Sequence, residues 1–101
     1  MKMLLVIFRQ SLDEDIGELL QELNLKAFTE APKVLGIGEA GRAADTLQQP
    51  GFNSLILSAL EDEQARDVIE RLTVFRDALS RKQHGAKIPL RVFVLPCEQV
   101  I

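Results

Sequence analysis

Glycines at positions 36, 38 and 41 stand at a spacing that is typical of phosphate-binding loops. Residues 36–41 read G-I-G-E-A-G and match the G-x-G-x-x-G pattern of dinucleotide-binding sites. Such sites need a long helix after the third glycine, whereas Pro50 limits any helix here to residues 42–49. We therefore discount a Rossmann site. Two interpretations stay open: a plain flexible loop, or a loop whose backbone contacts a nucleotide in another geometry, because glycines permit close approach.

The turn at residues 81–87, RKQHGAK, is a second candidate for binding. The cations Arg81, Lys82 and Lys87 could hold a phosphate together with loop amides around Gly85. The same composition is also that of an ordinary helix C-terminus, where cations and glycine are common. His84 is the only histidine of the chain, and a lone histidine in a basic turn is more typical of a solvated side chain than of a ligand.

Neither a metal site nor a catalytic residue is predicted. One cysteine, Cys97, and one histidine cannot supply four ligands from one chain. The serines lack a G-x-S-x-G context, and Cys97 has no basic sequence neighbour to activate its thiol. An acyl-phosphate hydrolase would need an arginine-bearing anion loop after the first strand, where Arg9 and Gln10 are the only candidates and the glycine-rich cradle is missing. We therefore predict that the protein is not an enzyme.

Short apolar stretches must position these segments. The predicted strands are residues 3–8, 26–37, 54–60 and 90–95. The stretches 3–8 and 54–60 are apolar throughout, which is typical of central strands. Pro32 interrupts the second strand and indicates an edge or a bulge. Residues 36–53 are a predicted loop, with one helical turn near 42–47.

Two helices are predicted between these strands. Ser11 and Glu14 fit a capping box, which predicts a helix over residues 11–24 with an apolar face. A second helix begins at the acidic residues 61–63 and ends near residue 82, with Gly85 as a plausible C-cap.

The order of elements predicts the fold. Strand, helix, strand, strand, helix, strand is typical of an α+β, ferredoxin-like βαββαβ sandwich, in which two helices cover one face of a four-stranded antiparallel sheet. We expect a single domain over residues 1–101. Strands this apolar suggest that the second sheet face is buried against other subunits; the alternative is a solvated face of moderate hydrophobicity.

Composition narrows the classes of function. The formal net charge is −3, without the basic footprint of a nucleic-acid binder. RNA recognition motifs share this element order but need exposed aromatics on central strands, and residues 54–60 contain none. No apolar run reaches the roughly 18 residues that a membrane span needs. The single cysteine agrees with a reducing compartment, so we expect a cytoplasmic protein.

Several segments together resemble the PII nitrogen-regulator superfamily. Residues 28–30 followed by 34–38 resemble the family's threonine strand leading into a G-F-G turn. Residues 85–88, GAKI, resemble its G-D-G-K-I phosphate loop, and residues 93–96, FVLP, its last strand. These segments keep the family's order over nearly the whole chain.

The resemblance implies a homotrimeric signalling protein that binds a small ligand in clefts between subunits. By this resemblance, the residues that would line the base and sugar of the ligand are Thr29, Gly36, Ile37 and Gly38. Gly85 and Lys87 would meet the phosphates of ATP, ADP or AMP. A short T-loop over residues 39–53 would then dock on a regulated transporter, enzyme or transcription regulator.

Departures from the pattern mark a divergent member. Ala86 stands where the phosphate loop keeps a glycine, and the chain has no tyrosine for uridylylation. An anion such as bicarbonate is therefore an alternative ligand. The rival interpretation is a trimeric protein of the divalent-metal-tolerance type without nucleotide binding, which would hold metal between chains through His84 or Cys97.

Overall fold

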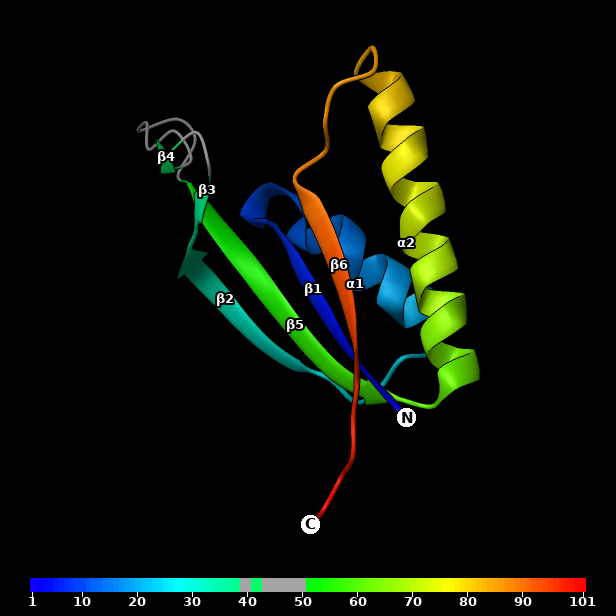
Figure 1. Ribbon diagram of the computed structural model, residues 1–101. Helices are drawn as coiled ribbons and strands as arrows, with labels where there is room; N and C mark the ends of the chain where they lie inside the picture. Colours follow the sequence, from blue (N-terminus) through cyan, green and yellow to red (C-terminus); the bar gives the residue numbers. More distant parts are fainter. Residues whose placement is uncertain (39–40, 43–50) are drawn as a thin grey trace.

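The computed structural model describes residues 1–38, 41–42 and 51–101. Its main sheet has four antiparallel strands in the order β2-β5-β1-β6. Their bounds are Thr29–Leu35 for β2, Phe52–Leu60 for β5, Lys2–Arg9 for β1 and Leu90–Pro96 for β6. The helices α1 (Asp13–Glu22) and α2 (Asp62–Lys82) cover one face of this sheet (Figure 1). The predicted ferredoxin-like α+β sandwich is confirmed.

The hydrophobic core lies between the sheet and the two helices. Alternate residues of the central strand β1, namely Leu4, Val6 and Phe8, are each 1% exposed, because successive side chains of a strand point to opposite faces. From the helices, Ile16 of α1 and Val68 of α2 are equally buried. In the described part of the chain, neither helix is long and apolar enough to cross a bilayer.

Two buried serines of β5 fix the first helix and its connection to the sheet. Ser54 donates a hydrogen bond from Oγ to Oδ1 of Asp13 at 2.6 Å, at the first residue of α1. Ser58 donates from Oγ to the carbonyl oxygen of Ala27 at 2.7 Å, in the connection between α1 and β2. Both serines are at most 3% exposed, and each hydroxyl has the partner that a buried polar group needs.

The predicted start of α1 is wrong in its detail. Gln10–Leu12 forms a single 3-10 turn, so that the α-helix begins at Asp13 with Leu12 as N-cap. Ser11 is exposed and makes no capping hydrogen bond, because it lies inside this turn instead of before the helix. The capping box that Ser11 and Glu14 suggest is therefore not formed.

Both helices end in a Schellman motif. At the end of α1, Asn24 has a φ of 59°, its amide donates to the carbonyl of Gln21, and that of Leu25 donates to Leu20. The end of α2 repeats the pattern, with His84 at φ 58°. The predicted glycine C-cap is therefore displaced by one residue, because His84 takes the left-handed position and Gly85 follows it.

The edge strand β2 is irregular as Pro32 predicts. Its register with β5 shifts between Ala31 and Val34, and Lys33 has a φ of 57° within this bulge. Beyond β2, the short strands β3 (Ile37–Gly38) and β4 (Gly41–Arg42) pair with one another. The predicted helical turn at 42–47 lies almost entirely outside the described residues, as do 39–40 and 43–50 of the predicted loop.

The second face of the sheet is apolar but not covered by any described element. We call it the open face; its apolar residues in the three strands β1, β5 and β6 are Met3, Leu5, Ile7, Leu55, Leu57, Ala59, Phe93 and Leu95. Arg91 opposite Ile7 and Thr29 opposite Leu57 lie on the same face. Leu57 and Phe93 both lie opposite Leu5 in the ladder, so their side chains share one face with it. Leu57 is 37% exposed and Phe93 47% exposed.

Candidate ligand-binding site

The glycine turn lies at the end of β2 that is nearest to the start of β5. Leu35 pairs with Phe52, and Ile37 and Gly38 then pair with Arg42 and Gly41 in the small β3–β4 sheet. Ile37 is 71% exposed, which leaves a large apolar side chain free beside the two glycines. Such a side chain can pack against the flat face of a base.

Gly36 has little room beside it. A Cβ atom at this position would lie 2.5 Å from Nδ2 of Asn53, so any side chain would have to displace that amide. The absence of a side chain therefore lets the turn lie directly against the start of β5.

Thr29 does not lie with the glycine turn. It is the first residue of β2 and pairs with Leu57, while Leu35 at the other end of β2 pairs with Phe52. The partners Leu57 and Phe52 are five steps apart on the regular strand β5, and at about 3.3 Å a step this places Thr29 roughly 17 Å from Leu35. One chain therefore does not gather Thr29, Gly36 and Gly38 into one pocket.

The basic turn after α2 is fastened by its own hydrogen bonds. The amides of His84, Gly85 and Ala86 donate to the carbonyls of Arg81, Ser80 and Gln83 at 2.8–3.2 Å. Ser80 also donates from Oγ to the carbonyl of Ala86 at 2.8 Å. These three amides are thus not free to cradle a phosphate, and what the turn offers an anion is the exposed Lys87 side chain on a rigid support.

The two turns lie at the same end of the sheet but at opposite edges. The glycine turn continues from β2, and the basic turn leads into β6 (Figure 1). Two strands, β5 and β1, separate these edges, and three strand spacings of about 4.8 Å add up to roughly 14 Å. A ligand bound to one chain would therefore meet either Gly36–Gly38 or Lys87, and not both.

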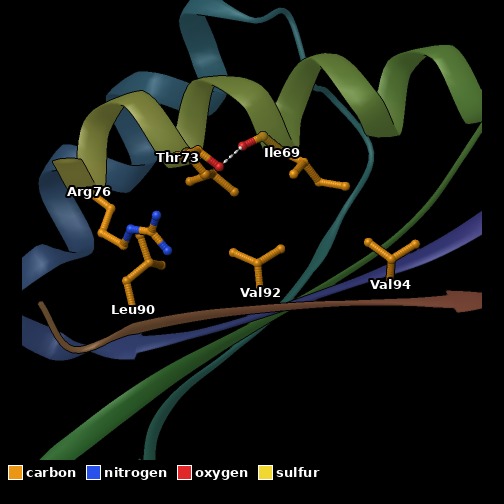
Figure 2. Close-up of a pocket in the computed structure, with 7 residues that line it drawn as sticks. Ile69, Thr73, Arg76, Leu90, Val92 and Val94 are labelled. Carbon is orange, nitrogen blue, oxygen red and sulfur yellow. Dashed lines mark hydrogen bonds between the residues drawn. The ribbon is translucent and has the colours of Figure 1, made fainter.

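A small groove lies between α2 and β6. Figure 2 shows its lining, in which Ile69 and Thr73 of α2 face Val92 and Val94 of β6, and Arg76 lies at one end. Its volume is about 200 Å³, below the range that drug-sized ligands usually fill. The Thr73 hydroxyl already donates to the carbonyl of Ile69 at 2.8 Å. We therefore do not assign a nucleotide to this groove.

His84 and Cys97 lie at opposite ends of the molecule. His84 precedes β6, whereas Cys97 follows it, and the amide of Cys97 donates to the carbonyl of Met1 at 3.3 Å. Among the described residues, no three His, Cys, Asp or Glu side chains come together as metal ligands. A metal held by both residues would have to join different chains.

The sequence assigns neither Asn53 nor Arg9 to the glycine turn, although Arg9 is a candidate for an anion loop after the first strand. Asn53 lies beneath Gly36, and Arg9 pairs with Asn53 at the end of β1. Nε of Arg9 is buried and has no hydrogen-bond partner among the described atoms. Only the register of β1 against β5 reveals this proximity, because 44 positions separate the two residues in the chain.

Solved structures of similar fold are PII-like proteins. CPII, a nitrogen regulatory PII-like protein from Thiomonas intermedia K12 bound to ADP, AMP and bicarbonate, superposes with a TM-score of 0.68 at 21% identity. The alignment covers 93% of this chain and 82% of that one. Its apo form gives a TM-score of 0.64 at 20% identity, covering 93% and 85% of the two chains. A PII-like signalling protein from Thermus thermophilus gives 0.59 at 17% identity, covering 93% and 83%.

The sequence itself also identifies the family. None of the curated protein sequences matches this chain. The family model for nitrogen regulatory protein P-II matches residues 1–101. The element order, the glycine turn and the last strand that resemble this family in sequence agree with that match. The chain is a PII-like signalling protein and belongs to the nitrogen regulatory protein P-II family.

Proposed function

We propose that this protein is a homotrimeric sensor that binds an adenine nucleotide or a small anion in clefts between subunits. The observation that carries this proposal is the split of the candidate site: its glycine turn and its basic turn lie at opposite edges of one sheet. One chain alone presents only one of the two turns at each edge. Two chains side by side would complete the cleft.

The open face supports a closed assembly of sheets. An apolar surface across three strands is stabilised when another apolar surface covers it. Three sheets that turn their open faces inward form a triangular core, and each sheet then meets its neighbour at an edge. Such a cyclic contact is heterologous, so the β2 edge of one subunit lies against the β6 edge of the next.

The two edges differ in a way that fits this arrangement. β2 carries Pro32 and a bulge at Lys33, features that discourage further strand pairing. β6 is regular, and apart from Arg91 its residues are apolar on both sides, with Val94 41% and Leu95 50% exposed. The regular edge β6 therefore needs cover more than β2 does. The neighbour's β2 edge would cover it by side-chain packing, without a continuous ladder of hydrogen bonds, and would bring the neighbour's Gly36–Gly38 turn to Lys87.

The chemistry of the two turns favours an anionic ligand with a flat apolar part. Lys87 is an exposed cation on a fixed turn, and Ile37 is an exposed apolar side chain beside two glycines. ADP or AMP has both parts, whereas bicarbonate has only the charge. Structures of similar fold hold ADP, AMP and bicarbonate, which supports these ligands without identifying one for this chain.

The output of the sensor would be the segment that continues from the glycine turn. β3 and β4 are its described part, and they begin directly at the proposed cleft. A ligand that contacts Gly36–Gly38 would thus bias the segment up to β5. We propose that this segment docks on a regulated partner, which is a transporter, an enzyme or a transcription regulator.

A thermal-shift screen with native mass measurement tests the proposal. The ligands are ATP, ADP, AMP, bicarbonate and divalent metals, and a ligand at 100 times its dissociation constant stabilises by about 2.7 kcal/mol. We expect a trimer that an adenine nucleotide or bicarbonate stabilises. A trimer that responds to metals alone would favour the metal-tolerance interpretation instead, and a monomer that no ligand stabilises would refute the sensor.

Two variants test the site itself. Lys87→Ala is expected to lower nucleotide affinity at least about tenfold, because it removes a charge-assisted contact. Gly38→Val is expected to weaken binding without unfolding the protein. Arg66→Ala is the matched control, since Arg66 is an exposed cation near the other end of α2, away from the basic turn. Unchanged binding by both test variants would show that the site assignment is wrong.

A further inference from the structure

A second groove lies between the two helices. Its volume is about 250 Å³, and its lining comes from facing stripes of α1 and α2. The lining residues are Asp15, Glu18, Leu19, Glu22, Arg71, Val74, Phe75 and Ala78. This helix groove belongs neither to the open face nor to the candidate ligand site.

One wall of the helix groove is acidic. α1 contains five acidic residues and no basic one, and three of the five line the groove. Glu22 accepts a hydrogen bond from Nη2 of Arg71 at 2.7 Å. Asp15 and Glu18 form no ion pair with any side chain in the described part of the chain. Two exposed carboxylates about one helical turn apart are thus available to a cationic partner.

The other wall contains Arg71, which is paired with Glu22, and is otherwise apolar. Val74 is 54% exposed although charged residues surround it on α2. Ala78 lies one turn further along the same wall, and its small side chain permits the close approach of another helix. Leu19 of α1 is 6% exposed and Phe75 of α2 is half-buried, so the floor joins the hydrophobic core.

We propose that the helix groove is a docking site for an amphipathic basic helix of a partner protein. Lys or Arg residues one turn apart on that helix would pair with Asp15 and Glu18. Its apolar stripe would cover Val74 and Ala78, as in other complexes that lay a helix into a groove. Two helices flank the groove without a free strand edge between them, so an extended peptide would gain no backbone hydrogen bonds there.

The occupant is not a second copy of this chain. On the proposed function, copies associate through the open face, which lies on the side of the sheet away from both helices. The helix groove then faces outward in the assembly. A partner bound there would contact the trimer at a place separate from the segment after the glycine turn.

The test uses the full chain and a designed probe. The probe is an amphipathic helical peptide of about 18 residues, long enough to form a helix in water, with leucines on one stripe and lysines beside it. The matched peptide replaces each lysine by glutamate. Fluorescence anisotropy measures the binding of both at about 0.15 M salt, where weak surface attraction is screened.

Three variants separate specific docking from general attraction to an acidic protein. Val74→Gln and the double variant Asp15→Asn/Glu18→Gln should each lower affinity for the lysine peptide about tenfold. The double variant Glu14→Gln/Glu63→Gln removes the same charge from exposed positions outside the groove and should stay within about twofold of the parent.

The outcomes decide the proposal. Binding of the lysine peptide that falls with both groove variants, but not with the control, supports it. It is overturned by no binding, by equal binding of the glutamate peptide, or by an equal loss in the control variant. Mass and ADP binding are measured on the same samples, so a failure of the trimeric sensor would be seen separately from a failure of the helix groove.

Discussion

The two faces of the sheet carry similar apolar residues in very different surroundings. Toward the helices, Leu4 and Val6 are each 1% exposed. On the open face, their neighbour Leu5 is only half-buried, and Leu57 opposite it remains exposed. The helices account for the composition of the first face. The second face has the composition of a buried surface without its cover, which indicates that the chain is built to associate.

The largest effect is expected from a charge placed on the open face. Leu57→Asp should abolish assembly, because three buried carboxylates in a triangular core would be desolvated without partners. Analytical ultracentrifugation should show the mass fall from trimer to monomer while circular dichroism keeps its helical signal. Val74→Asp is the matched control, since Val74 is also an exposed apolar residue but lies in the helix groove.

A Leu57→Asp variant that stays trimeric would show that the open face is not the interface. A parent protein that is already monomeric would show that the open face is exposed to solvent and needs no cover from other subunits.

The helix-covered face should respond through stability instead of assembly. Phe8→Ala should lower the free energy of unfolding by about 3–5 kcal/mol, because it leaves a cavity in the closed core. Phe93→Ala should cost less than about 1 kcal/mol when both variants are made in the monomeric Leu57→Asp background, since Phe93 is 47% exposed in the single chain. Urea unfolding at one protein concentration measures both. Equal costs would mean that the two faces do not differ as described.

The sequence predicts the fold well where local pattern and tertiary structure agree. Apolar runs such as 3–8 become the central strands, and Pro32 lies beside a bulge on an edge strand. It fails where neighbours distant in sequence decide the local structure. Ser11 matches a capping box, yet the chain forms a 3-10 turn there, and Ser54 from β5 bonds to Asp13 where α1 begins.

The candidate site divides in the same way. Gly36 and Gly38 could be chosen from sequence, because glycine spacing is a local signal. The separation of Gly85 and Lys87 from them is a property of strand order, which places β5 and β1 between the two turns. No local signal places Asn53 or Arg9 at the glycine turn, since only strand register brings them there. Composition indicates an assembly, but its geometry depends on which strands form the edges.

Among the polar groups of the covered face, the Ser54–Asp13 hydrogen bond should matter most. Ser54→Ala should lower the free energy of unfolding by about 1–2 kcal/mol, because a buried hydrogen bond to a carboxylate is lost. Ser11→Ala should cost less than about 0.5 kcal/mol, whereas loss of a true N-cap costs about 1 kcal/mol. Thermal and urea unfolding measure both. A larger cost at Ser11 than at Ser54 would restore the capping box.

The smallest effect is expected at the rim, where the amino terminus meets α2. The N-terminal ammonium lies 3.2 Å from Oδ1 of Asp62, whose side chain is 63% exposed. Asp62→Asn should therefore cost no more than about 1 kcal/mol, and less at high salt. Because Asp62 also lies at the positive end of α2, part of this cost should persist when the amino terminus is acetylated.

The free energy of unfolding is measured for the parent and for Asp62→Asn, each with a free and with an acetylated amino terminus. This double-mutant cycle isolates the energy of the ion pair. A coupling energy indistinguishable from zero would show that this ion pair adds nothing to the attachment of α2, which would then rest on its buried apolar face.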